Sequence, residues 1–290
     1  MKKNTNRPCR FSSFWGLFNM LSIDVAIGAI LSGLFVQIII PFNVNWVYWI
    51  ILSLSVWIIY TADHLVDAYR LKANAHTDRH LFHYKNFRRI LIAIVLLSMI
   101  VLNLVIFYLP TTVFYYGLGI GIFSLLYFFL LHVNKSSVFL QKEIIVAIIY
   151  TLGIWGVPLI LNNFSIDLYR ILLLFGFFIL ALADILLLSY FELDSDIKDN
   201  HVTWAVKFGK RKTKQMIRAL LGIINIICVC LFVANSRELE KIAGIIYLLM
   251  ATLIMGMISF PEKFEKQFLY RYLVEFVFWL PGLMLFFYTY

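Results

Sequence analysis

Nine apolar runs divide the sequence, and polar or basic stretches separate each run from the next. The runs cover residues 17–40, 46–66, 90–109, 112–132, 143–161, 170–192, 215–234, 241–260 and 268–289. An α-helix needs roughly 20 such residues to cross a bilayer. Pro41, Pro110 and Pro261 fall at run ends, where helices stop, whereas Pro158 and Pro281 lie inside runs and predict kinks. The pattern predicts an all-α polytopic membrane protein, with nine transmembrane helices in a single bundle over residues 1–290.

The composition strengthens the membrane interpretation. Of the 290 residues, 62% are hydrophobic and 14% are charged, whereas a soluble domain has about 45–50% apolar and about 25% charged residues. The net charge of +9 does not indicate a nucleic-acid partner, because the basic residues stand beside apolar runs, where they set topology and meet anionic lipid. We therefore expect the lipid bilayer as a partner and no nucleic acid.

The distribution of Lys and Arg predicts the orientation of the bundle. With a cytoplasmic N-terminus, nine spans place 22 of the 25 basic residues on the cytoplasmic side, and only Arg170, Arg237 and Lys241 outside. Such a bias is the positive-inside signal of membrane proteins. The sequence thus predicts a protein of a bacterial cytoplasmic membrane, with its N-terminus in the cytoplasm and its C-terminus outside.

Acidic residues close two of the runs on the predicted cytoplasmic side. Asp63 and Asp67 end the second run, and Glu192, Asp196 and Asn200 follow one another at intervals of four at the end of the sixth. Side chains four apart share one face of a helix, and carboxylates held close together favour a cation between them. Cytoplasmic loops 67–89 and 193–214 are predicted to carry these motifs. We expect Asp63, Asp67, Glu192 and Asp196 to bind Mg²⁺.

Basic residues accompany both acidic ends, which is the combination that a magnesium-bound diphosphate requires. The candidates for contact with diphosphate are Arg70, Arg79, Lys198 and Lys207. Within the runs, Asp24 and Asp184 are costly to bury in lipid, so they are expected to face a cavity or to bond to another helix.

Histidines add one further candidate site. His76, His80 and His83 lie near Asp78 and could bind a transition metal. The many basic neighbours favour a cationic loop instead. His64 and His201 flank the acidic pairs, either as groups that support metal ligands or as interfacial histidines.

Layout and motifs together resemble the UbiA-type superfamily of intramembrane prenyltransferases. The first motif of that family, Asn-Asp-x-x-Asp-x-x-x-Asp, is matched here by Asp67 alone, because Asp63, His64 and Leu71 occupy its other places. The second motif is matched in spacing throughout. Its positions hold Glu192, Asp196, Asn200, Thr203 and Gly209.

The resemblance implies a Mg²⁺-dependent enzyme that transfers an isoprenoid chain from a prenyl diphosphate to an aromatic or lipophilic acceptor within the membrane. Asp24 and Asp184 would then lie on the acceptor side. His64 and Leu71 leave fewer ligands than the family has, so a catalytically inactive homologue stays open. A second alternative is a transporter or lipid-binding protein that uses Asp24 and Asp184 for coupling or recognition.

Overall fold

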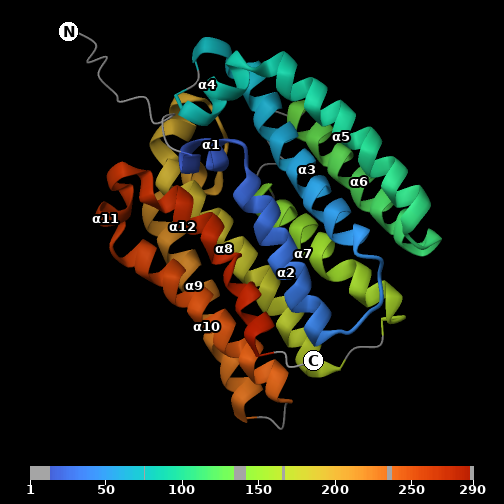
Figure 1. Cartoon of the computed structure of the whole chain (residues 1–290). Helices are drawn as coiled ribbons and strands as arrows, with labels where there is room; N and C mark the ends of the chain where they lie inside the picture. Colours follow the sequence, from blue (N-terminus) through green and yellow to red (C-terminus); the bar gives the residue numbers. More distant parts are fainter. Residues whose placement is uncertain (1–13, 75, 134–141, 165–166, 234–236, 288–290) are drawn as a thin grey trace.

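A computed structural model describes residues 14–74, 76–133, 142–164, 167–233 and 237–287. Every regular element among these described residues is a helix (Figure 1). The elements are α1 Phe14–Met20, α2 Ile23–Ile39, α3 Val47–Leu71, η2 Lys72–Asn74, α4 Asp78–Lys85, α5 Phe87–Tyr108, α6 Thr111–Val133, α7 Lys142–Leu161, α8 Leu168–Lys198, α9 Trp204–Val233, α10 Glu238–Ser259, α11 Pro261–Glu265, η4 Lys266–Phe268, α12 Leu269–Val277 and η5 Leu280–Phe286.

The all-α membrane class predicted from the sequence is confirmed. Six of the described helices, α3, α5, α7, α8, α9 and α10, are long and apolar enough to cross a membrane. The pair α12 and η5 is a seventh candidate, bent by 44° next to Pro281, the residue expected to kink the last run. Helix α2 and residues Thr111–Tyr127 of α6 are apolar but shorter. Each apolar run therefore contains a helix, although the count of nine spans stays a prediction.

Helix α8 forms the centre of the bundle. It packs against α7, α9, α10 and α12, and 61% of its apolar window is buried, against 6% for α5 at the periphery. Close packing is visible at Gly176, where the ring of Tyr247 occupies the space that a side chain would need. The Tyr247 hydroxyl donates a hydrogen bond of 2.8 Å to the carbonyl of Leu173. Residues carried by α8 are thus held by neighbours on several sides.

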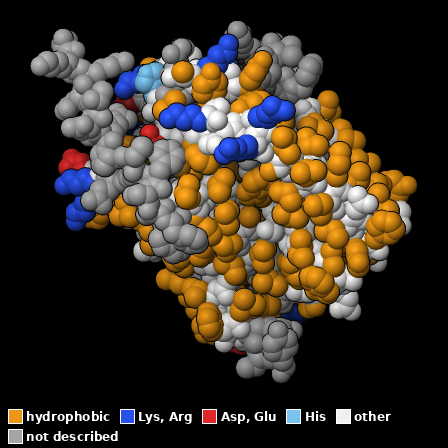
Figure 2. Space-filling view, turned by 45° about the horizontal axis from the view of Figure 1, so that its top comes forward, with side chains coloured by type: hydrophobic (Ala, Val, Ile, Leu, Met, Phe, Trp, Pro, Cys, Tyr) orange, Lys and Arg blue, Asp and Glu red, His pale blue; other side chains and the backbone are white. Residues whose placement is uncertain are grey.

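The surface agrees with a bundle that faces lipid. Hydrophobic side chains cover most of the face in Figure 2, and Lys and Arg gather toward one end. Phe107 is 76% exposed and Leu125 is 69% exposed, which in water would leave large apolar areas unburied. Such exposure is expected where acyl chains are the solvent.

The helix connections separate onto two ends of the bundle. At one end, Asp167 lies 3.8 Å from Arg170 and 3.9 Å from Arg237, so the α7–α8 and α9–α10 connections meet. At the other end, Arg70 at the close of α3 touches His201 after α8. The alternation matches the predicted up-and-down order. The N-terminal tail and the last three residues lie outside the described residues, and the orientation in the membrane stays a prediction.

The two segments predicted as loops are largely helical, which corrects the expected boundaries. Helix α3 continues to Leu71 and α8 continues to Lys198, so the acidic residues lie on helix rather than loop. Only residues 199–203 separate α8 from α9. Toward these helix ends, Leu65 of α3 and Phe191 of α8 are still packed, with under 10% of their surface exposed.

Candidate functional site

The end of α8 determines the geometry of the site. Asn200 adopts the left-handed conformation, with φ 53°, and the N–H of His201 donates to the carbonyl of Asp196 at 2.8 Å. The N–H of Asn200 donates to the carbonyl of Ile197 at 3.3 Å. These two bonds form a Schellman cap, for which Asn is a suitable residue. Asn200 therefore ends the helix. Its spacing from Glu192 and Asp196 had predicted a third side chain on the acidic face, and that prediction was wrong.

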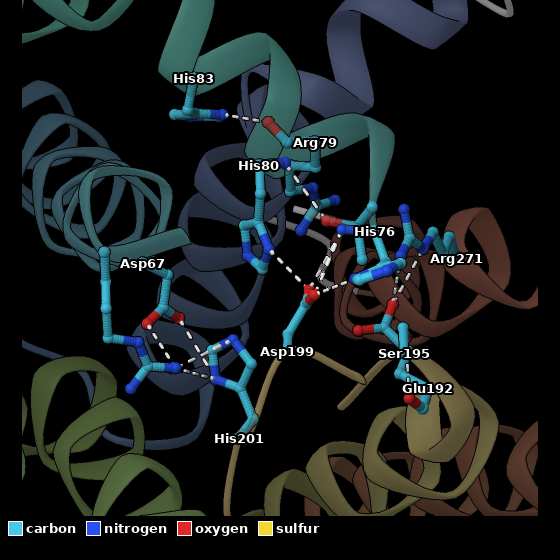
Figure 3. Close-up of polar contacts among 12 residues, drawn as sticks. Asp67, His76, Arg79, His80, His83, Glu192, Ser195, Asp199, His201 and Arg271 are labelled. Atoms are coloured by element: carbon cyan, nitrogen blue, oxygen red, sulfur yellow. Dashed lines mark hydrogen bonds and ion pairs between the residues drawn. The ribbon is translucent and has the colours of Figure 1, made fainter. Parts of the chain in front are cut away.

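Asp199, the C-cap residue of α8, lies against α4. Asp199 is buried, and its carboxylate lies 2.6 Å from Nδ1 of His76 and 3.9 Å from Nδ1 of His80. The backbone N–H of His76 also donates to this carboxylate at 3.2 Å. Figure 3 shows Asp199 between the two imidazole rings. Asp199 was not among the predicted site residues, because nothing in its local pattern distinguishes it from the neighbouring acids.

His201 joins the two acidic helix ends. Its Nδ1 lies 3.9 Å from Oδ2 of Asp67 on α3, and its ring stacks on that of His80 with centroids 5.8 Å apart. The guanidinium of Arg70 lies 3.2 Å from the same ring. The ends of α3 and α8 therefore lie together, as the sequence predicted, but histidine and arginine stand between their carboxylates (Figure 3).

The four predicted magnesium ligands each have basic or polar neighbours. Glu192 accepts from Nε of Arg271 at 2.8 Å, and Asp196 accepts from the hydroxyl of Thr203 at 3.0 Å. The charge of Lys142 acts on both Asp63 and Asp67.

In the part of the chain that the structure describes, the four predicted magnesium ligands do not gather into one close group, and the binding of Mg²⁺ stays a prediction. Mg²⁺ prefers several oxygen ligands in near-octahedral geometry. Among the His, Cys, Asp and Glu side chains of the described residues, one group of three has its ligand atoms within 4.8 Å of one another. It consists of His80, Asp199 and His201.

The predicted diphosphate-binding residues separate into two groups. Arg79 and Lys198 line a polar cavity of about 620 Å³ between α1, α4, α8 and α12. Arg70 lies with Asp67 and His201 instead, and the ammonium of Lys207 lies 5.7 Å from the ring centre of Phe208. Sequence reasoning missed Lys210 and Arg271, which also line this cavity.

The polar cavity carries an excess of basic groups. Four Lys and Arg side chains and three carboxylates line it, together with His76. Arg79 is fixed by its contact with Nε2 of His64 at 3.0 Å and by its bonds to Asn19 at 3.1 Å. Arg271 is held by Glu192. Positioned guanidinium groups at a cavity wall are suited to bind an anion.

A second cavity, of about 520 Å³, lies among the apolar helices. Its lining is almost entirely hydrophobic, but it includes Asp184 of α8, Glu275 of α12, and the rings of Tyr60 and Tyr150. The prediction that Asp184 faces a cavity is confirmed. Asp24 instead accepts a bond of 2.6 Å from the Asn19 amide, near the fixed guanidinium of Arg79.

Burial favours the neutral form of His80, His83 and His201, because it lowers the pKa of each ring. Removal from water lowers the pKa of His83 to about 4 and the pKa of His201 to about 4. Desolvation also lowers the pKa of His80, against the opposing effect of Asp67, Glu192 and Asp199. Neutral imidazoles can donate on one nitrogen and accept, or bind a metal, on the other.

Comparison with family models, curated proteins and solved structures finds no match to this chain. The resemblance to UbiA-type prenyltransferases therefore rests on the sequence motifs and stays a prediction.

Proposed function

We propose that this chain is an intramembrane prenyltransferase of UbiA type, which transfers an isoprenoid chain from a prenyl diphosphate to an aromatic or lipophilic acceptor. One observation carries the proposal, the succession of an apolar and a polar cavity along the same two helices. On α8, Asp184 lines the apolar cavity and Phe191 the polar one, about 10 Å further along the helix axis. On α12, Glu275 lines the apolar cavity and Arg271 lines the polar one. A ligand with an apolar chain and an anionic head would fit these two successive cavities.

In this proposal the basic side chains stabilise the departing diphosphate. The bond between the allylic carbon and the diphosphate oxygen breaks, and Arg79, Lys198 and Arg271 face the negative charge that develops. Fixed guanidinium groups need little reorganisation during the reaction. Arg70 and Lys207, predicted for the same role, are not among the residues that line the polar cavity.

The apolar cavity would hold the isoprenoid chain and the acceptor. Its hydrophobic wall excludes water, which would otherwise capture an allylic cation. Asp184 and Glu275 are the acidic groups that could take up the proton an acceptor loses. Helices α2 and α6 and the bent pair α12–η5 count as spans in this proposal, which brings the bundle to nine. Mg²⁺ remains a prediction of the sequence, to be tested as a separate variable.

Purified full-length protein, reconstituted with a lipid extract that supplies acceptors, tests the proposal. We expect release of diphosphate from prenyl diphosphates and a prenylated lipid product by mass spectrometry. Arg271→Gln and Arg79→Gln should lower release at least about 10-fold, because each removes a charged partner of the leaving group. Lys241→Gln, at the opposite end of the bundle, is the matched control. Assays with Mg²⁺ and with EDTA test the metal.

Other outcomes assign other functions. Saturable binding of prenyl diphosphate without any product would indicate an inactive homologue or a lipid-binding protein. Release that is equal in the wild type, Arg271→Gln and Arg79→Gln would exclude the polar cavity as the site of chemistry. Absence of both binding and release would reject the prenyl diphosphate itself.

A further inference from the structure

We propose that His80, Asp199 and His201 bind one divalent transition-metal ion of the zinc and ferrous class. Their ligand atoms all lie within 4.8 Å of one another. His80 comes from α4, whereas Asp199 and His201 come from the cap that follows α8. The set combines two imidazoles and one carboxylate, which suits zinc or ferrous iron better than the oxygen-preferring Mg²⁺.

The central carboxylate is built into the fold. The side chain of Asp199 is 2% exposed, and the N–H and imidazole of His76 orient it. A carboxylate at this depth needs compensating partners, since a buried unpaired charge is strongly unfavourable. Its oxygen near His80 lies 3.9 Å away, too far for a hydrogen bond and suitable for an ion in between.

His80 supplies an independent observation. Its Nδ1 is buried and has no hydrogen-bond partner among the described residues. Leaving a buried polar atom unsatisfied costs about 1–3 kcal/mol, so such atoms in proteins call for an explanation. A metal ion bound to this nitrogen removes the deficit. The carboxylates of Asp67, Glu192 and Asp199 act on the His80 ring, where the guanidinium of Arg79 opposes them.

The geometry requires only modest closure. Tetrahedral zinc holds nitrogen and oxygen ligands at about 2.0–2.2 Å, which separates neighbouring ligand atoms by about 3.3–3.5 Å. The distance of 3.9 Å between His80 and Asp199 is slightly longer. Asp67 lies 3.9 Å from Nδ1 of His201 but does not belong to the group whose ligand atoms lie within 4.8 Å of one another, so the described part of the chain supplies three ligands. Arg70 must leave the ring of His201, and its side chain, at 46% exposed, has room to turn toward water.

The proposed ion would fasten α4 to the end of α8. Helix α4 and the residues before it supply His76, Asp78 and Arg79 to the wall of the polar cavity. A metal bridge would therefore fix that wall relative to the bundle. The inference concerns metal binding by these three side chains and does not depend on prenyl transfer.

Cobalt binding to the full-length protein in detergent tests the inference. After treatment with EDTA and its removal, Co²⁺ is added and the visible absorption is recorded, because nitrogen and oxygen ligands in tetrahedral geometry give intense bands. We expect saturation at about one Co²⁺ per chain. His80→Gln and His201→Gln should each weaken binding by at least about 100-fold, beyond the loss typical for a residue that only supports a ligand. Zn²⁺ should displace the cobalt signal.

His83→Gln is the matched control. His83 lies one turn from His80 on α4, but its Nδ1 donates to the carbonyl of Arg79 at 2.9 Å, outside the proposed ligand set. Circular dichroism and gel filtration confirm that each variant is folded. Wild-type protein without a visible Co²⁺ spectrum, or with affinity equal to that of His80→Gln and His201→Gln, overturns the inference. Because no prenyl diphosphate is present, this result is separate from the fate of the proposed enzyme activity.

Discussion

Glu192 illustrates how a neighbour distant in sequence changes the role of a residue. Its position in the second acidic motif predicts a metal ligand, yet Arg271 on α12 contacts its carboxylate with both Nε and a terminal nitrogen at 2.8 Å. The two side chains are 26% and 17% exposed, so water screens the pair only in part. The ion pair fixes α12 to α8 and orients Arg271 in the polar cavity.

Removing one partner of this pair should destabilise the protein. Arg271→Gln leaves the Glu192 charge without its main partner, and we expect a loss of about 1–3 kcal/mol in the free energy of unfolding. The double variant Arg271→Gln with Glu192→Gln should recover part of this loss, because no unpaired charge remains. Thermal unfolding in detergent measures both.

The pair between Lys241 and Glu238 provides the comparison. It is nearly as short, at 3.0 Å, but Glu238 is 84% exposed, and exposed pairs contribute about 0–1 kcal/mol. Lys241→Gln should therefore change the unfolding temperature little. Equal effects of Arg271→Gln and Lys241→Gln would contradict a structural role for the Glu192 pair.

His83 predicts an acid-sensitive fold. Its ring is fully buried, and burial lowers its pKa from 6.5 to about 4. Above pH 6.5 the folded and unfolded states both hold it neutral, and stability is fully present. As the pH falls from 6.5 toward 4, the unfolded state binds a proton that the folded state cannot, so stability is lost.

Between pH 7 and pH 5 this loss should reach about 2 kcal/mol. His83→Gln removes the titrating group and should flatten the dependence of the unfolding temperature on pH over that interval. Parallel pH profiles for the wild type and His83→Gln would show that other groups account for the acid sensitivity.

At the scale of elements, the cap after α8 has the largest consequence for the site. Asp199, the last residue before Asn200, faces α4, and the left-handed conformation of Asn200 turns the chain so that His201 faces α3. Asn tolerates this conformation better than other residues with a side chain, and Gly adopts it without penalty. The helix end and the site geometry therefore depend on the same residue.

Substitutions of Asn200 should reveal this dependence. Asn200→Gly should be neutral within about 0.5 kcal/mol, whereas Asn200→Val should cost about 1–2 kcal/mol, because a β-branched residue is unfavourable at φ 53°. Ile197→Val, at an exposed helical position of the same turn, is the control. Stability equal in Asn200→Val and Asn200→Gly would argue against the cap as the determinant.

For the whole molecule, the sequence predicted the periodic features best. Apolar runs located every helix that has membrane character, and the spacing of basic residues anticipated that alternate connections meet at the same end. Both depend on the bilayer, which imposes length and hydrophobicity on each span separately. The bend between α12 and η5 next to Pro281 was also predicted, because a proline kinks a helix at its own position.

The site was predicted only in outline. The sequence placed the acidic ends of α3 and α8 together, but not the residues that mediate their meeting. His201 approaches Asp67 because of a cap, and Glu192 binds Arg271 because α12 packs on α8; neither relation has a local signal. The histidine-rich segment was interpreted as a cationic loop because of its many basic neighbours. Its partners Asp199 and His201 lie more than 100 positions further along the chain and gave no local signal.

The apolar cavity leads to a final prediction, which rests on the proposed function. Gly121 of α6 and Gly153 of α7 line this cavity, and a Cβ atom added at either would have no neighbouring atom within 4 Å. A larger residue should therefore fill the cavity without disturbing the packing. If the cavity holds the isoprenoid chain, its volume sets the longest chain that binds.

Gly121→Leu and Gly153→Leu should lower the affinity for long prenyl diphosphates at least about 10-fold, because lost burial of two methylene groups corresponds to about 1.6 kcal/mol. Binding of short ones should change much less. Gly222→Leu on α9 is the control, because open space also surrounds Gly222 but it does not line the cavity. Competition binding with prenyl diphosphates of increasing length measures the effect. Equal losses for short and long chains, or a loss with Gly222→Leu of the same size, would place the isoprenoid chain elsewhere in the protein.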